Sequence, residues 1–195
     1  MNPNLLHARA IQGRFTGCSI GIIDTIRFVK VARAAAVMED SSVLSAAERQ
    51  GIRRWFADYL AWMSTHKNGM QERDAQNNHG TCWVLQAAGF ARFTGNSGMT
   101  AWCRETYRTA LLTSQMAPDG SFPLELKRTK PFGYSLFNMD AMTGVYRVLA
   151  TPEDVIWQCQ LNDEYLRLWR SLKADSSVDE VIRNWPIRKP VLWVE

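Results

Sequence analysis

Residues 74–96 read DAQNNHGTCWVLQAAGFARFTGN, which is a polar cluster followed by an apolar, helix-like run and a Gly-Asn stop. The spacing of the apolar residues predicts a helix over residues 80–93 that ends near residues 94–96. Asparagine is a good N-cap, and the free backbone N–H groups at a helix N-terminus favour anions. Two interpretations follow. Either Asn77 or Asn78 simply caps the helix and His79 lies on the surface, or all three hold an anionic group.

Helical periodicity extends along the rest of the chain. Ser45 and Glu48 form a capping-box pattern, with an apolar stripe from Ile52 to Met63 behind it. Further helices are expected over residues 24–38, 99–116, 134–149 and 151–172, and no convincing strand alternation is present. The sequence therefore predicts one all-α domain over residues 1–195, built from antiparallel helical hairpins. Such a series fits an α/α solenoid or toroid better than a four-helix bundle.

One segment is long and irregular for a helical domain, namely residues 118–133, PDGSFPLELKRTKPFG. Long loops in compact domains are usually functional or disordered. The apolar residues Phe122, Leu124 and Leu126 are expected to anchor this one, so an ordered loop is predicted. It carries charged residues and leads into a tyrosine: Glu125, Lys127, Arg128, Lys130 and Tyr134. Taken alone, the charges describe a solvated basic loop and the tyrosine describes ordinary core.

Composition and charge exclude several classes of function. The net charge of +4, without a Lys/Arg run longer than two residues, is too weak to indicate nucleic-acid binding. No apolar run approaches the roughly 18–20 residues of a membrane span, and the first thirty residues lack a signal-peptide pattern. The four cysteines are scattered and do not have zinc-site spacing, so no metal site is predicted. Buried free thiols are expected, with one disulfide left open.

The polar residues together indicate a specific chemistry. Amide, imidazole and guanidinium groups can all neutralise a carboxylate, and a tyrosine hydroxyl can carry a proton. This set suits β-elimination from a uronic acid, in which the carboxylate must be neutralised before the neighbouring C5 proton is removed. A base then takes that proton and an acid protonates the departing O4. No cofactor is required.

The motifs NNHGTCW and DGSFPLELKRTKPFGYSLFNMDAM together resemble the alginate lyase family of α/α-toroid polysaccharide lyases. The opening of the chain and the segment NWPIRKPVL near its end are similar to the family as well. The resemblance implies that Asn78, His79 and Arg128 contact the substrate carboxylate and that Tyr134 is the catalytic proton carrier. It also leads us to expect substrate contacts from Asn77, Glu125 and Trp83. The implied partner is an anionic polysaccharide, outside the cell or in the periplasm.

The chain also departs from the family pattern. Family enzymes are longer and usually carry a signal peptide, so the chain is expected to be an N-terminally truncated member with an exposed apolar edge. Two other functions remain open: a non-catalytic or degenerate carbohydrate-binding homologue, and a helical interaction scaffold. The sequence does not indicate which uronate is cleaved, whether cleavage is endo or exo, or the oligomeric state. If the enzyme interpretation is right, Asn78, His79, Arg128 and Tyr134 should converge on one concave surface.

Overall fold

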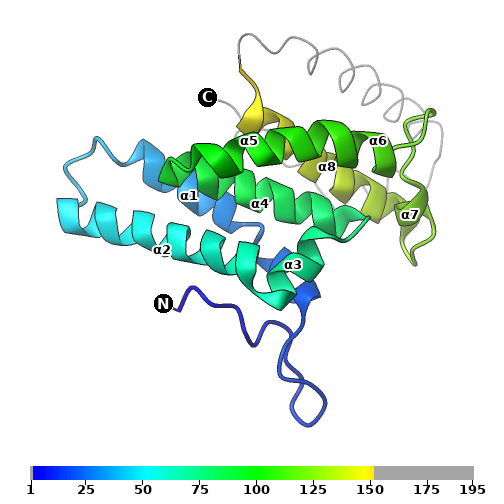
Figure 1. The fold of residues 1–195 in the computed structure, drawn as a ribbon, viewed down its shortest axis with the longest axis horizontal. Helices are drawn as coiled ribbons and strands as arrows, with labels where there is room; N and C mark the ends of the chain where they lie inside the picture. The colour runs from blue at the N-terminus through cyan, green and yellow to red at the C-terminus, as the bar shows by residue number, and fades with distance from the viewer. Residues whose placement is uncertain (1, 152–195) are drawn as a thin grey trace.

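The structure, a computed structural model, describes residues 2–151 of the chain (Figure 1). Within this range the regular secondary structure is helical, and the β structure is limited to an isolated bridge between Ile11 and Phe15. The predicted all-α fold is therefore confirmed. The expected helix near residues 151–172, the NWPIRKPVL segment and Cys159 lie outside the described residues. The elements in order are η1 (Ser19–Thr25), α1 (Phe28–Val37), α2 (Ala46–Thr65), α3 (Lys67–Arg73), α4 (Asn78–Thr94), α5 (Ser97–Thr106), η2 (Tyr107–Leu111), α6 (Leu112–Gln115), α7 (Pro123–Leu126) and α8 (Pro131–Leu149).

Helix α4 is the centre of the described fold. It packs against α1, α2, α3, α5 and α8, and most of its residues are buried. Figure 1 shows it enclosed by these helices. A helix that is apolar on all sides is stable only inside a protein, which explains why its sequence lacks a polar stripe. The polar cluster at its N-terminus is therefore held by a helix that is packed on several sides.

The ends of the helices follow from local sequence. Ser45 and Glu48 form the predicted capping box at the start of α2. Helix α4 ends at Gly95, which has a left-handed φ of 76° that glycine adopts without strain. The helix predicted over residues 99–116 is present but is divided, because a π-helical turn (η2) separates α5 from α6. Periodicity does not reveal such a turn, since the chain on either side of it remains helical.

Residues 118–133 are ordered, as predicted, but the segment differs from the prediction in its details. A short helix, α7, lies inside it, and α8 begins at Pro131 rather than at Tyr134, because proline is favoured in the first helical turn. Phe122 is buried as expected, whereas Leu124 and Leu126 are exposed and Glu125 between them is buried. The sequence also gave no indication of α3.

The cysteines and the exposed apolar residues add two details. Cys18, Cys82 and Cys103 are free thiols, and the last two are buried. Among large apolar side chains, exposure is greatest at Val37 and Val43, on α1 and in the loop that follows it. The expected apolar edge remains a prediction, because these side chains are not shown to form one continuous patch.

Candidate active site

Asn77 is the N-cap of helix α4. Its side-chain oxygen accepts a hydrogen bond from the backbone N–H of His79 at 3.1 Å. This contact satisfies one of the N–H groups that a helix leaves free at its start. The capping interpretation is therefore right for Asn77, and its Oδ1 is engaged within the helix rather than directed to a ligand.

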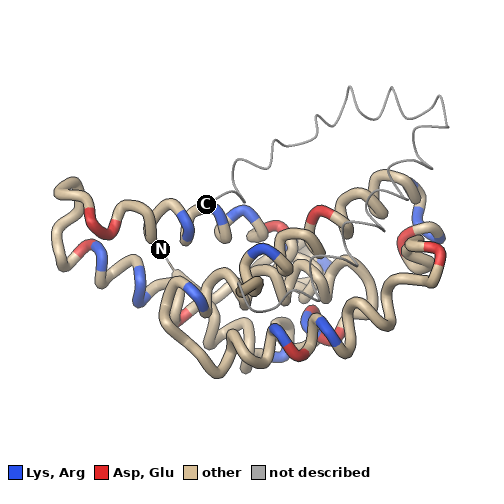
Figure 2. Tube along the Cα trace, turned by 90° about the horizontal axis from the view of Figure 1, so that it is seen from above, with Lys and Arg blue, Asp and Glu red and all other residues tan. Residues whose placement is uncertain are grey.

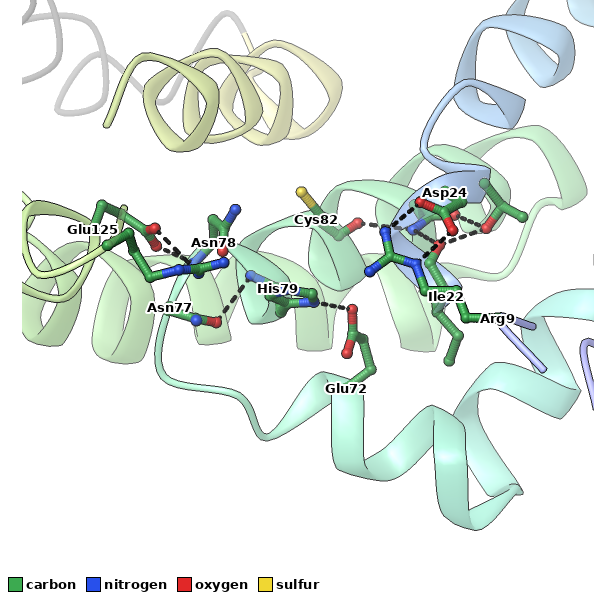
Figure 3. Close-up of polar contacts among 12 residues, drawn as sticks. Arg9, Ile22, Asp24, Glu72, Asn77, Asn78, His79, Cys82 and Glu125 are labelled. Carbon is green, nitrogen blue, oxygen red and sulfur yellow. Dashed lines mark hydrogen bonds and ion pairs between the residues drawn. The ribbon is translucent and has the colours of Figure 1, made fainter. Parts of the chain in front are cut away.

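A carboxylate of the protein itself, that of Glu125, lies at the start of this helix. Glu125 is 1% exposed, and its Oε1 accepts a hydrogen bond from the backbone N–H of Asn78 at 2.6 Å (Figure 3). A carboxylate is stabilised there by the N–H group and by the positive end of the helix dipole. Glu125 was expected to bind substrate, but its burial gives it a different position. It ties α7 to the first turn of α4.

Arg128 lies between Glu125 and Tyr134. Its Nη1 is 3.7 Å from Glu125 Oε2, and its guanidinium carbon lies 4.0 Å from the centre of the Tyr134 ring. The Arg128 and Tyr134 side chains are both half-buried. The buried carboxylate thus orients a cation over the aromatic face, where the ring's electron density attracts it.

His79 is not a surface residue. Its side chain is 14% exposed, and its Nδ1 lies 2.6 Å from Glu72 Oε1. Glu72, on α3, is itself 2% exposed. Sequence reasoning did not identify Glu72. It lies seven residues before His79, and the two side chains meet only because the chain turns between α3 and α4.

Asn78 is 1% exposed, and its Oδ1 has no hydrogen-bond partner among the described residues. A buried amide oxygen without a partner is uncommon, so this atom is available to a water or a ligand group. Below it, Gln115 holds the start of α4 by donating from Nε2 to the carbonyl of Asn77 at 3.1 Å. Gln115 Oε1 in turn accepts hydrogen bonds from Thr81 and Asn138.

Trp83 was expected to contact substrate, and the structure places it in the core instead. The side chain is 1% exposed and packs edge-on against Trp102, with ring centroids 5.6 Å apart. A ring buried to this degree presents no face on which a sugar can stack. Its neighbours explain the tryptophan through packing.

The remaining predicted residues are linked by contacts. One connected series runs from Glu72 to His79, along the backbone to Asn78, through Glu125 to Arg128, and from there to the Tyr134 ring. It joins α3, α4, α7, the turn after α7 and the first turn of α8. The series brings an amide, an imidazole, a guanidinium and a phenol into one region of the molecule. Whether they line one concave surface remains a prediction.

No group of three or more His, Cys, Asp or Glu residues within 2–151 is arranged to hold a metal ion. Acidic and basic residues are both spread along the described trace (Figure 2). Among the helices of the described part, none is long and apolar enough to cross a membrane.

A surface hollow lies at the opposite end of α4, between α4 and α5. Its two arginines are engaged elsewhere, since Arg92 donates to the carbonyl of Val148 and Arg104 to that of Leu149. These bonds satisfy carbonyls at the C-terminus of α8. The two arginines therefore have a structural role at this hollow. It is lined by Ala91, Arg92, Gly95, Ser97, Thr100, Ala101 and Arg104.

Comparisons with known proteins point to one family. A sequence model of the family described as Alginate lyase matches residues 1–166. The crystal structure of an alginate lyase from Bacteroides ovatus aligns with a TM-score of 0.69 and 31% sequence identity. The alignment covers 79% of this chain and 43% of that enzyme, so the chain spans less than half of its structural relative. No curated protein sequence matches the chain.

Proposed function

The chain belongs to the alginate lyase family, and from this premise we propose that it is a polysaccharide lyase that cleaves a polyuronate, namely alginate, by β-elimination. The observation that carries the proposal is the placement of Arg128 against the face of Tyr134 by the buried Glu125. Structural packing alone does not require a buried acid, an arginine and a half-buried tyrosine in this order.

Carboxylate neutralisation falls to three residues in this proposal. Arg128 directs one guanidinium nitrogen toward Glu125 and keeps further N–H groups for the uronate carboxylate, since a guanidinium has five donors. His79 and the Asn78 side chain provide additional hydrogen bonds. Together they stabilise the charge that develops on the carboxylate when the C5 proton leaves, and this stabilisation lowers the barrier.

Tyr134 carries the proton. Its hydroxyl oxygen, as phenolate, takes the C5 proton; the electron pair forms the C4=C5 double bond, and the C4–O4 bond breaks. The same hydroxyl then returns the proton to the departing O4, so atoms and charge balance without a cofactor. Arg128 supplies a permanent positive charge beside the ring that must bear negative charge during the cycle.

The remaining predicted residues act indirectly. Asn77 caps α4 and Glu125 orients Arg128, so both support the geometry rather than bind the sugar. The exposed Lys127 and Lys130 flank Arg128 and suit a polyanionic chain. We propose an extracellular or periplasmic site of action, where such polysaccharides occur.

The proposal is tested by incubating the purified chain with polymannuronate, polyguluronate and polyglucuronate and recording ultraviolet absorbance. β-Elimination leaves a conjugated C4=C5 uronate that absorbs, whereas hydrolysis does not. Release of this product, lost in Tyr134→Phe, supports the lyase. Binding of oligouronates without product would instead favour a non-catalytic carbohydrate-binding homologue.

A further inference from the structure

The buried pair of Glu72 and His79 goes beyond the chemistry above. Glu72 is 2% exposed, and a carboxylate so far from water is tolerated only when it is paired and hydrogen-bonded. Its Oε1 is 2.6 Å from His79 Nδ1, a distance typical of a strong, charge-assisted hydrogen bond. Figure 3 shows the carboxylate directed at the imidazole ring.

Two glycines permit the close packing of the backbone around this pair, Gly69 between α3 and α2 and Gly80 between α4 and the end of α3. A Cβ at Gly69 would lie 2.0 Å from the carbonyl oxygen of Met63, so α3 can fold back on α2 only without a side chain there. A Cβ at Gly80 would lie 2.1 Å from the carbonyl oxygen of Ala75, directly after the histidine. These are backbone atoms, which cannot move aside as a flexible side chain can. The close approach of α3 to α4 is therefore built into the sequence.

The nearby cation, Arg9, is hydrogen-bonded to another carboxylate, so His79 is the close partner of Glu72. The Arg9 pKa is raised mainly by hydrogen bonding to Asp24, at 2.8 and 2.7 Å. The through-space interaction with Glu72 is the smallest contribution. The Arg9 guanidinium is therefore engaged by Asp24, and the short contact of Glu72 is with His79.

We infer that Glu72 is a positioning residue that fixes the ring orientation and tautomer of His79. By accepting a hydrogen bond from Nδ1–H, the carboxylate leaves Nε2 as the nitrogen available to substrate. In the protonated ring Nε2–H donates to the substrate carboxylate while Glu72 balances the charge of the ring; in neutral His79 with its proton on Nδ1, Nε2 is an acceptor. Without Glu72 the ring is free to rotate and to place its proton on Nε2. The catalytic consequence rests on the proposed lyase function, whereas the tautomer does not.

The tautomer is measured by two-bond ¹H–¹⁵N correlation spectra of the labelled chain. The chain has 3 histidines, and the signals lost in His79→Gln assign the one of interest. We expect the parent to carry its proton on Nδ1 and Glu72→Leu to shift it to Nε2. Glu72→Gln, whose amide oxygen still accepts from Nδ1–H, should retain the parent tautomer. An Nε2–H tautomer in the parent overturns the inference, even if no variant folds.

Kinetics on a polyuronate provide the second measurement. Glu72→Leu should lower kcat by about tenfold or more while KM changes by less than about threefold, because a group that stabilises the charge developing on the substrate carboxylate acts mainly in the transition state. Glu72→Gln should recover part of that loss. Asp74→Asn, which removes a charge from the exposed pair with Arg73 nearby, serves as the matched control and should retain the parent kcat. Circular dichroism checks that each variant is folded.

The two proposals fail separately. If the parent releases no unsaturated product, the lyase function fails, and the tautomer measurement still decides the role of Glu72. If the parent is active and Glu72→Leu keeps its kcat within about twofold, the positioning role is wrong and the lyase function stands.

Discussion

The guanidinium carbon of Arg128 lies 4.0 Å from the centre of the Tyr134 ring, and the same arginine lies 3.7 Å from the buried carboxylate of Glu125. The two contacts hold the cation in a fixed place. A lone surface arginine loses side-chain entropy when it is held, but here the carboxylate and the ring define its position before substrate arrives. Arg128 and Tyr134 therefore have different roles, charge stabilisation and proton transfer, and each role can be tested by substitution.

Tyr134→Phe keeps the ring under Arg128 and removes only the hydroxyl. We expect turnover to fall by at least about 10²-fold while oligouronate binding changes little, because the lost group acts in the transition state. Product absorbance measures turnover, and calorimetry measures binding. Tyr146→Phe, three turns further along α8, is the control. If Tyr134→Phe works within a few-fold of the parent, the proton must be carried by another group.

Arg128→Ala should weaken both binding and turnover, because the guanidinium is proposed to contact the substrate carboxylate before and during the reaction. Arg128→Lys should recover only part of the loss, since an ammonium lacks the planar, two-pronged geometry. The neighbouring Lys127→Ala removes the same charge from an exposed position and serves as the control. Equal effects of Arg128→Ala and Lys127→Ala, in KM and kcat, would reduce the role of Arg128 to general electrostatics.

Asn77 should behave as a helix cap rather than as a substrate ligand. Asn77→Ala is expected to lower the free energy of unfolding by about 1 kcal/mol, and Asn77→Ser to restore it, because serine also caps well. Asn96→Ala removes the corresponding cap from α5, where the side chain accepts from the N–H of Met99, and gives the scale of the effect. Urea unfolding measures both. A loss of activity in a stable, folded Asn77→Ser would show that the amide itself meets the substrate.

The sequence predicted α4 and its cap well because every local signal agreed there. Asparagine precedes the helix, an apolar run fills it, and glycine ends it in a left-handed conformation. Asn78, His79, Arg128 and Tyr134 were also predicted from the sequence as site residues, and this remains a prediction. Their links were not predicted, because they depend on contacts between separate elements, such as the 47-residue separation of Asn78 and Glu125.

Two sequence predictions, for the residues around Glu125 and for Trp83, placed the wrong side chains in the core or at the surface. In residues 122–126 the apolar pattern predicted Leu124 and Leu126 as anchors, yet the buried residue between them is Glu125. Burying a carboxylate costs hydration free energy, which here is offset by a helix N-terminus and a cation. Neither partner can be recognised from the local sequence. Trp83 was misjudged in the opposite sense, since a large aromatic suits both a sugar platform and a core.

Alkaline stability should report the buried ionisable groups. Burial raises the pKa of Cys103 from 9.0 to about 12, and burial raises that of Tyr59 from 10.0 to about 12, against a hydrogen bond with Thr25 that lowers it. Above about pH 9 the unfolded chain loses these protons while the native chain keeps them, so the free energy of unfolding falls as pH rises toward 12. Urea unfolding across this range measures the slope. Cys103→Ala should make it shallower, and a flat profile in the parent would contradict the prediction.

Gly80→Ala tests whether the close approach of α3 to α4 sets the site. The added methyl would lie 2.1 Å from the carbonyl oxygen of Ala75, so the backbone must shift, and we expect a loss of about 1–3 kcal/mol in the free energy of unfolding. The shift should also separate Glu72 from His79 and lower kcat in the folded fraction. Gly51→Ala is the matched control: it lies within α2 with no atom within 4 Å of the new methyl, and it should stabilise the chain by about 0.5–1 kcal/mol. Thermal and urea unfolding measure both, and a Gly80→Ala chain as stable and active as Gly51→Ala would mean that the turn before α4 does not hold the pair.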